Sequence, residues 1–188
     1  MPTPQVTTLS IPEVLLLSPH VFRDERGYFF ESYNQRSWSE AGVACTFVQD
    51  NSSLSKKGTL RGLHAQVRTP QAKLIRVLEG VIFDVAVDIR RGSPTFGQWA
   101  GAYLTAKGFE QLFLPEGFAH GFCVVSDSAR IAYKVTDFYD PGGEISIAWN
   151  DPEIGIEWPI DAPLLSDKDH SAARLADLKD ALPHWQSP

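Results

Sequence analysis

Cysteine and long apolar runs are both scarce in this sequence. The two cysteines, Cys45 and Cys123, lie in the apolar stretches VACTF and GFCVV, which favours reduced core thiols over a disulfide framework. The early apolar run VLLL is far too short to span a bilayer, and it lacks the charged flank and cleavage site of an export signal. These absences predict a cytoplasmic protein without a membrane span.

A surplus of positive charge is also lacking. The chain has 17 Lys and Arg against 23 Asp and Glu, which gives a formal net charge of −6. Such a net field does not attract nucleic acids or anionic membrane surfaces, so neither is an expected partner. An anionic ligand must therefore meet a local cluster of basic side chains.

Low-complexity tracts, internal repeats and long linkers are missing as well. A chain of 188 residues is long enough to bury most of its apolar surface in one core. We therefore expect a single domain over residues 1–188.

The sequence does contain a regular succession of turn signals, such as DERG, RRGSP and DPGG, between segments rich in Val, Ile, Phe and Tyr. In residues 81–89 (VIFDVAVDI), apolar side chains alternate with Asp84 and Asp88, and the alternation in residues 131–137 (IAYKVTD) turns Tyr133 inward. Helix is expected only around NQRSWSEAG and in the C-terminal tail SAARLADLKDAL. The pattern predicts an all-β barrel with a few short helices, one of them C-terminal.

Two segments resemble the metal-binding motifs of cupin barrels. The resemblance rests on six residues at matching spacings: Gly58, His64, Gly80, Pro115, Gly117 and His120. It implies a cupin fold, which is a double-stranded β-helix or jelly-roll barrel.

Two of the expected metal ligands are replaced. Gln66 stands where the second histidine belongs, and Lys73 stands where the glutamate belongs. An ammonium group at that position repels a divalent cation, so we expect no bound metal. Lys73 can instead stabilise an oxyanion in a dry pocket, as a Lewis acid does.

Stabilisation of an oxyanion points to proton abstraction next to a carbonyl. That reaction needs a base, a group that holds the enolate oxygen and, for inversion, an acid on the opposite face. His64 is the natural base, and it needs a carboxylate partner that fixes its tautomer. Tyr133 is a neutral proton donor at working pH and can act from the far side.

At this point the resemblance becomes specific. The segments FRDERGYFFESYN, GTLRGLH, AKLIRVLEGVIFDVAVDIRRGSPTFGQW, QLFLPEGFAHGF, YKVTDFYDP and LLSDKD together resemble the dTDP-4-dehydrorhamnose 3,5-epimerase family. The resemblance implies a cupin homodimer without cofactor or metal that acts on a dTDP-linked 4-keto-6-deoxyhexose. It implies that His64 is the base, Asp169 its carboxylate partner and Tyr133 the acid. It also implies that Lys73 and His120 contact the C4 oxygen of the sugar.

The same resemblance implies residues that bind the nucleotide. Phe22 and Tyr139 resemble the aromatic pair that holds the thymine, and Arg26 and Arg61 resemble the arginines that meet the diphosphate. Three further positions resemble nucleotide and sugar contacts: Glu31, Gln49 and Asn51.

The position of Arg61 conflicts with simple strand alternation. Alternation places Arg61 on the face opposite His64, so Arg61 is expected to act at a strand end or across the dimer. The family builds its site partly from the early strands of the neighbouring subunit, which implies that activity requires the oligomer.

Several residues have a plainer interpretation. Tyr133 alone is compatible with core packing, Lys73 with a solvated strand, and Asp169 with a helix N-cap. Phe113 and Ser52 depart from the Trp and His that are frequent in the family. These departures bear on the identity of the sugar more than on the reaction.

The sequence therefore predicts an isomerase that inverts C3 and C5 of dTDP-4-dehydro-6-deoxy-D-glucose, giving dTDP-4-dehydro-L-rhamnose. Two alternatives stay open. One is an epimerase of a single centre, C3 or C5, or a ketoisomerase of another dTDP-deoxysugar. The other is a non-catalytic cupin that only binds a sugar nucleotide. A metal-dependent oxygenase is a third and weaker alternative.

Overall fold

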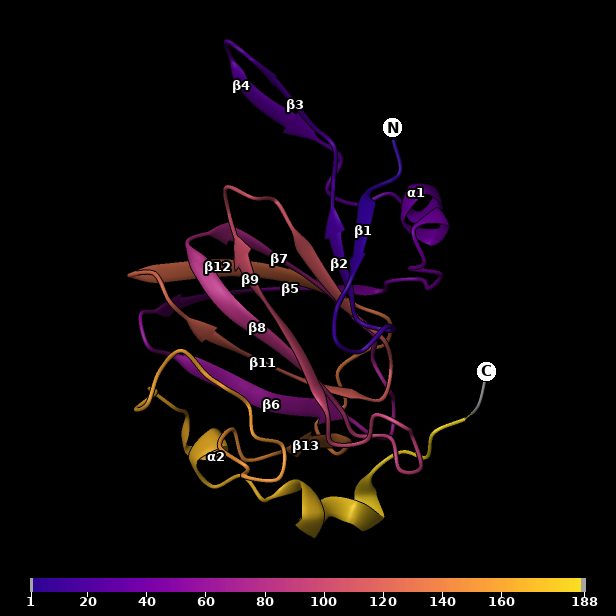
Figure 1. Ribbon diagram of the computed structural model, residues 1–188, viewed down its shortest axis with the longest axis vertical. Helices are drawn as coiled ribbons and strands as arrows, with labels where there is room; N and C mark the ends of the chain where they lie inside the picture. Colours follow the sequence, from indigo (N-terminus) through magenta and orange to yellow (C-terminus); the bar gives the residue numbers. More distant parts are fainter. Residues whose placement is uncertain (1, 187–188) are drawn as a thin grey trace.

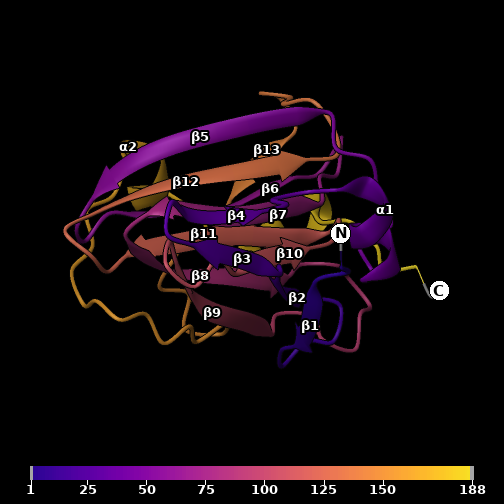
Figure 2. The same cartoon turned by 90° about the horizontal axis from the view of Figure 1, so that it is seen from above.

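Two antiparallel sheets lie face to face, and a two-stranded hairpin extends from them (Figures 1 and 2). This arrangement comes from a computed structural model that describes residues 2–186. No helix among these residues is long and apolar enough to cross a bilayer.

The first sheet has six strands, in the order β1 (Gln5–Thr8), β2 (Leu15–Ser18), β10 (Gln111–Leu114), β7 (Lys73–Glu79), β12 (Ser128–Val135) and β5 (Gln49–Lys56). The second sheet has five strands, in the order β13 (Glu144–Ser146), β6 (Leu60–Gln66), β11 (Phe118–Val124), β8 (Val81–Asp88) and β9 (Trp99–Thr105). Neighbouring strands far apart in the chain, such as β7 with β12 and β6 with β11, give the crossed connections of a jelly roll. The predicted all-β cupin barrel is confirmed.

The main core lies between the two sheets. Alternation directs Ile75 and Ile131 of the first sheet and Ile82 and Phe122 of the second into the same cluster, and all four are nearly inaccessible to solvent. Burial of such side chains stabilises the fold by roughly 1.5–3 kcal/mol each.

The outer face of the second sheet is apolar too. Val85 and Val87 of β8 point away from the barrel interior and pack under Ile147, Leu175 and Leu182 from the C-terminal part of the chain. β8 is consequently buried on both faces, and Asp84 and Asp88 are fully buried with it.

The two predicted helices differ in outcome. The first is α1 (Gln35–Glu40), whose N-cap Asn34 accepts hydrogen bonds from the backbone of Arg36 and Ser37. The C-terminal one is a 3₁₀ helix, η1 (Leu175–Ala181), rather than an α-helix. Arg174 offers it no side-chain cap, and its first amide donates to the Asp151 carboxylate at 2.8 Å.

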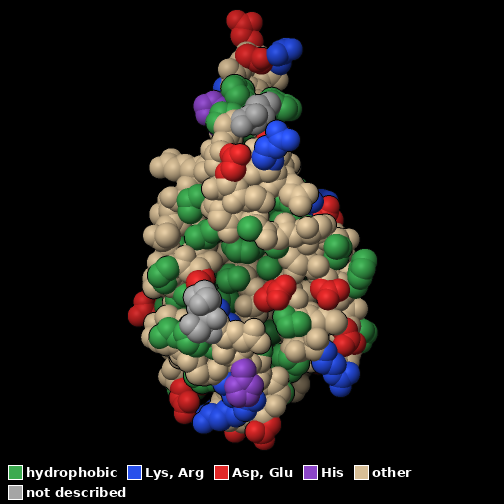
Figure 3. All heavy atoms as spheres, turned by 90° about the vertical axis from the view of Figure 1, so that its right-hand side faces the viewer, with side chains coloured by type: hydrophobic (Ala, Val, Ile, Leu, Met, Phe, Trp, Pro, Cys, Tyr) green, Lys and Arg blue, Asp and Glu red, His purple; other side chains and the backbone are tan. Residues whose placement is uncertain are grey.

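The hairpin consists of β3 (Val21–Asp24) and β4 (Gly27–Phe30), which pair only with each other. It rises from the rounded body as a narrow extension that carries both charged and hydrophobic side chains (Figure 3).

Candidate active site

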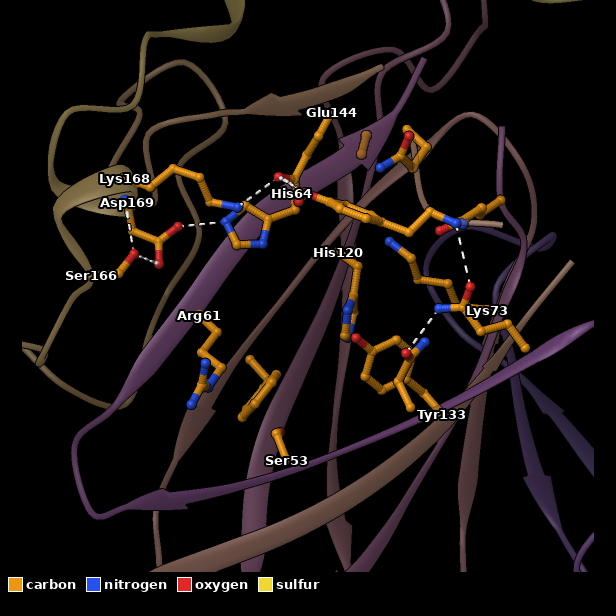
Figure 4. Close-up of a pocket in the computed structure, with 17 residues that line it drawn as sticks. Ser53, Arg61, His64, Lys73, His120, Tyr133, Glu144, Ser166, Lys168 and Asp169 are labelled. Carbon is orange, nitrogen blue, oxygen red and sulfur yellow. Dashed lines mark hydrogen bonds and ion pairs between the residues drawn. The ribbon is translucent and has the colours of Figure 1, made fainter. Parts of the chain in front are cut away.

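A cavity of about 520 Å³ is lined by side chains from both sheets and from α2 (Asp167–His170), as Figure 4 shows. Its size is in the range of small-molecule sites, roughly 300–1,000 Å³. Nine residues predicted for the site line it: Gln49, Asn51, Arg61, His64, Lys73, His120, Tyr133, Tyr139 and Asp169. Three predicted residues lie elsewhere: Phe22, Arg26 and Glu31.

The prediction that Arg61 faces away from His64 is wrong. Arg61 pairs with Phe122 and His64 pairs with His120. Two residues of β6 lie between Arg61 and His64, but one residue of β11 lies between Phe122 and His120, so β6 contains a bulge. The extra residue reverses the alternation and brings the side chains of Arg61 and His64 to the same cavity wall. Arg61 therefore needs neither a strand end nor a second subunit to reach the cavity.

His64 is held by a carboxylate. Its Nε2 lies 2.5 Å from Oδ1 of Asp169, which is 4% exposed. An ionised carboxylate only accepts hydrogen bonds, so Nε2 carries the hydrogen and Nδ1 is left free to take a proton. The pair joins β6 to α2 across 105 positions of the sequence.

Asp169 is kept ionised by its neighbours. Burial alone would raise its pKa, but hydrogen bonds from His64 and Ser166 and the charge of Lys168 lower the pKa below its usual range. Ser166, not Asp169, is the N-cap of α2, because its hydroxyl accepts from the Asp169 amide at 3.2 Å. The plainer interpretation of Asp169 as an N-cap is thus wrong.

Tyr133 and Lys73 come from the first sheet, on the wall opposite His64. Strand register places Tyr133 beside Ile75 and Asn51, and places Lys73 beside Val135 in the next row. Figure 4 shows Lys73, Tyr133 and His120 directed toward one another. Burial raises the pKa of the Tyr133 phenol, Arg61 opposes the rise, and Glu144 adds to it, so the phenol stays protonated at neutral pH.

Lys73 is a buried ammonium group, not a solvated strand lysine. Its side chain is 7% exposed, and no carboxylate among residues 2–186 lies within ion-pairing distance of it. Burial lowers its pKa to about 8, although the negative charges of Glu144 and Asp84 favour the ammonium form. It is protonated at neutral pH and is available to an oxyanion in the cavity.

Asp84 is a functional candidate that the sequence analysis missed. His120 of β11 pairs through Nε2 with Oδ1 of Asp84 on β8, so a second histidine–carboxylate pair faces the same cavity. Alternation placed Asp84 on the face of its strand opposite Phe83, Val85 and Val87. Nothing in the sequence indicated that the face with Asp84 lines the barrel interior.

Glu144 and Lys168 were missed as well. Lys168 donates to the Glu144 carboxylate at 2.9 Å, and Tyr139 donates to the same oxygen at 3.2 Å. Burial would raise the pKa of Glu144, but Lys168, His64 and Tyr139 together lower it. Two features of the sequence could have indicated these residues. Glu144 lies opposite the apolar face of EISIAWN, and Lys168 is adjacent to Asp169.

The comparisons agree with this geometry. The family model described as dTDP-4-dehydrorhamnose 3,5-epimerase matches residues 8–177. The chain belongs to this epimerase family. A dTDP-4-dehydrorhamnose 3,5-epimerase of Pseudomonas aeruginosa is 57% identical over 175 residues, covering 92% of this chain and 97% of the relative.

Two other members of the epimerase family matter for the function. A dTDP-4-dehydrorhamnose 3-epimerase of Streptomyces niveus is 40% identical over 175 residues, covering 92% of this chain and 84% of the relative. The crystal structure of a dTDP-6-deoxy-D-glucose-3,5-epimerase of Legionella pneumophila, in complex with dTDP-4-keto-L-rhamnose, is 46% identical with a TM-score of 0.95. It covers 98% of this chain and 100% of its own.

The cavity of this epimerase-family chain does not fit a cupin metal ion. The four side chains at the cupin ligand positions are His64, Gln66, Lys73 and His120, and they include an ammonium but no carboxylate. Within residues 2–186, no group of three or more His, Cys, Asp or Glu side chains is placed to hold a metal.

Phe22, Arg26 and Glu31 lie outside the cavity of their own chain. Phe22 and Arg26 are on the hairpin, and the Arg26 side chain is 90% exposed and paired with Asp24. Glu31 follows the hairpin, where one carboxylate oxygen accepts from Asn34 and the other is buried without a partner.

Proposed function

We propose that this chain inverts C3 and C5 of dTDP-4-dehydro-6-deoxy-D-glucose, giving dTDP-4-dehydro-L-rhamnose for dTDP-L-rhamnose synthesis. One observation carries the proposal: a carboxylate-backed histidine and a protonated tyrosine project from opposite sheets into one cavity that also holds a buried ammonium. These groups supply the base, the acid and the oxyanion partner that epimerisation next to a ketone requires.

The steps follow from the positions of the groups. His64 takes the proton from the carbon next to the C4 carbonyl, and Asp169 stabilises the imidazolium that forms. The electron pair moves to the C4 oxygen, where Lys73 and His120 hold the enolate. Tyr133 donates a proton to the opposite face of the carbon and regains one from solvent, and the His64 imidazolium releases its proton to solvent. A second cycle inverts the other carbon.

The nucleotide is assigned to the open side of the cavity. Tyr139 is 53% exposed and offers a ring face to the thymine, while Arg61 offers a guanidinium to the diphosphate. Gln49 and Asn51 project from β5 into the same space. This local charge answers how an acidic protein holds an anion.

A second copy of the chain completes the site in this proposal. Phe22 and Arg26 are presented by an exposed hairpin that does not reach the cavity of its own body. We assign them, with Glu31, to the cavity of the partner in a homodimer. Three exposed aromatic rings on one projecting hairpin, those of Phe22, Tyr28 and Phe29, support this, since such rings are enriched at protein interfaces.

Solvent exchange tests the reaction. The 4-keto sugar nucleotide is incubated with the enzyme in D₂O and followed by NMR, and we expect deuterium at both C3 and C5. Deuterium at C3 alone would identify a 3-epimerase, the activity named for the Streptomyces niveus relative. No exchange at all would leave only a binding protein.

The base is tested separately. His64→Ala should lower kcat by roughly 10² to 10⁴-fold, the usual contribution of a general base, while dTDP affinity and thermal stability stay near those of the wild type. Exchange at the wild-type rate in this variant refutes the assignment of His64.

A further inference from the structure

The hairpin β3–β4 lacks support from neighbouring strands. Neither strand pairs with the two large sheets, and an isolated two-stranded hairpin is marginally stable in water. Contacts between its side chains and the body must therefore determine the direction in which it projects.

Those contacts converge on Phe109, in the turn between β9 and β10. Its ring lies edge-on to Tyr28 and to Phe30, with ring centroids 4.7 and 4.9 Å apart. The guanidinium carbon of Arg23 lies 5.3 Å from the centre of the Phe109 ring. Tyr28 and Phe30 share one face of β4, and Arg23 is the cross-strand partner of Tyr28, so three side chains of this face meet the Phe109 ring. The guanidinium carbon of Arg76, on β7, adds a contact with the Phe30 ring at 5.3 Å from its centre.

Phe109 adopts a costly backbone conformation. Its φ of 65° lies in the left-handed region, which bulky residues rarely occupy, and it is the only non-glycine residue with positive φ among residues 2–186. The turn is fixed by two bonds to Thr105, whose hydroxyl accepts from the Gly108 amide and whose carbonyl accepts from the Phe109 amide. The ring is 8% exposed, so this conformation drives it under the hairpin instead of into solvent.

The opposite face of the hairpin is exposed, and on it the Phe22 ring lies edge-on to His20, just before β3, with ring centroids 4.5 Å apart. Phe22 and Phe29 are cross-strand partners, 43% and 60% exposed, and Arg26 lies in the turn at the tip. Because β3 and β4 are paired along their whole length, the contact of the inner face with Phe109 also determines where the outer face points.

We infer that Phe109 is a positioning residue: it sets the angle of the hairpin and so presents Phe22 and Arg26 to the cavity of a second copy of the chain. The inference rests on the shared site proposed above. Phe109 itself touches no substrate.

The test compares Phe109→Ala with the wild type. Loss of the ring should raise KM for the sugar nucleotide and Kd for dTDP by about tenfold with kcat nearly unchanged, because nucleotide binding is weakened equally in the ground and transition states. Phe109→Tyr keeps the ring and should restore both constants. Phe109→Gly relieves the backbone strain without restoring the ring, so it should bind dTDP as weakly as Phe109→Ala.

Phe83→Ala is the matched control. Phe83 is also 8% exposed and contacts three aromatic rings, but it lies on the outer face of the second sheet and makes no aromatic contact with the hairpin. It should lower thermal stability and leave KM and Kd unchanged. Equal changes in KM for the two Ala variants, or no change for Phe109→Ala, overturn the inference.

Two hairpin variants separate this inference from the shared site. Phe22→Ala and Arg26→Ala should each raise KM, and Phe109→Ala combined with Phe22→Ala should raise it by less than the product of the single effects. If the hairpin variants raise KM and Phe109→Ala does not, only the positioning role fails. If neither hairpin variant changes KM or Kd, both the shared site and the role of Phe109 are refuted.

Discussion

Lys73, the proposed partner of the enolate oxygen, is buried at a cost in stability. Its pKa of about 8 lies below the value near 10.4 of a lysine in an unfolded chain. Between these two values the unfolded chain binds more protons, so stability should increase as pH rises from about 8 to about 10. Below pH 8, burial of the ammonium costs on the order of 3 kcal/mol.

Lys73→Met should therefore act in opposite directions on rate and stability. We expect kcat to fall by roughly 10² to 10³-fold, because an oxyanion partner is lost. The melting temperature should rise by roughly 5 °C, because a buried charge is replaced by an apolar group of similar size. Kinetics and calorimetry at pH 7 measure both.

The pH profile provides the internal check. Wild-type kcat should decline as pH rises through about 8, where Lys73 loses its proton. Tyr133 cannot cause that decline, since burial raises its pKa above 10. A wild-type profile that is flat across this range, or a variant that melts below the wild type, contradicts the role of the ammonium.

At the scale of single residues, the sequence indicated the local part of the site. Motif spacing located His64 and Lys73, and alternation turned Tyr133 inward. The partners of these groups were harder to find, because Asp169 lies 105 positions from His64 and was reached only through the family resemblance. Asp84 was missed because both faces of its strand are buried, so polarity alone did not mark the functional side.

Among the elements, β6 is where simple periodicity fails. The bulge that aligns Arg61 with His64 brings the backbones of β6 and β11 unusually close. Gly62 has a φ of 112°, and a Cβ there would lie 2.5 Å from the His120 carbonyl oxygen and 2.6 Å from Cα of Gly121. Only glycine satisfies both the backbone angle and the spacing.

Gly62→Ala should therefore push the two strands apart and disturb both cavity histidines. We expect a loss of more than about 2 kcal/mol in the free energy of unfolding together with a large drop in kcat/KM. Gly92→Ala is the control, because Gly92 has a φ of 84° but no atom within 4 Å of where a Cβ would lie, so it tests the backbone angle alone. Equal losses in denaturant unfolding of the two variants would show that the close approach is unimportant.

The element pattern also explains what could be read in advance. Strands with one apolar face, such as β12, were predictable from alternation, and a helix was expected around NQRSWSEAG, where α1 lies. A one-residue bulge does not change the pattern of polar and apolar residues along the strand. Gly62 and Leu63 are compatible with regular pairing and with the bulged pairing alike.

For the whole molecule, the question is whether each site is built from two chains. If it is, protomers with different defects should complement each other. Protomers carrying His64→Ala have a defective body, and those carrying Arg26→Ala have a defective hairpin. Random pairing in an equal mixture leaves one intact site in half of the dimers, which should restore about a quarter of wild-type activity at low substrate.

A second mixture is the control. His64 and Tyr133 both belong to the body of one chain, so His64→Ala mixed with Tyr133→Phe should restore nothing. Complementation in the control, or none in the first mixture, contradicts the exchanged hairpin. The overall barrel was foreseeable from strand spacing, but the reach of the hairpin depends on the fold of the whole chain.

The apolar outer face of the second sheet has a consequence for biosynthesis. Val85 and Val87 emerge from the ribosome long before Ile147, Leu175 and Leu182, which shield them. The nascent barrel therefore has an exposed apolar face until residues 147–182 have been translated. Asp169 arrives in the same segment, so the residues that protect this face from aggregation also bring His64 its carboxylate.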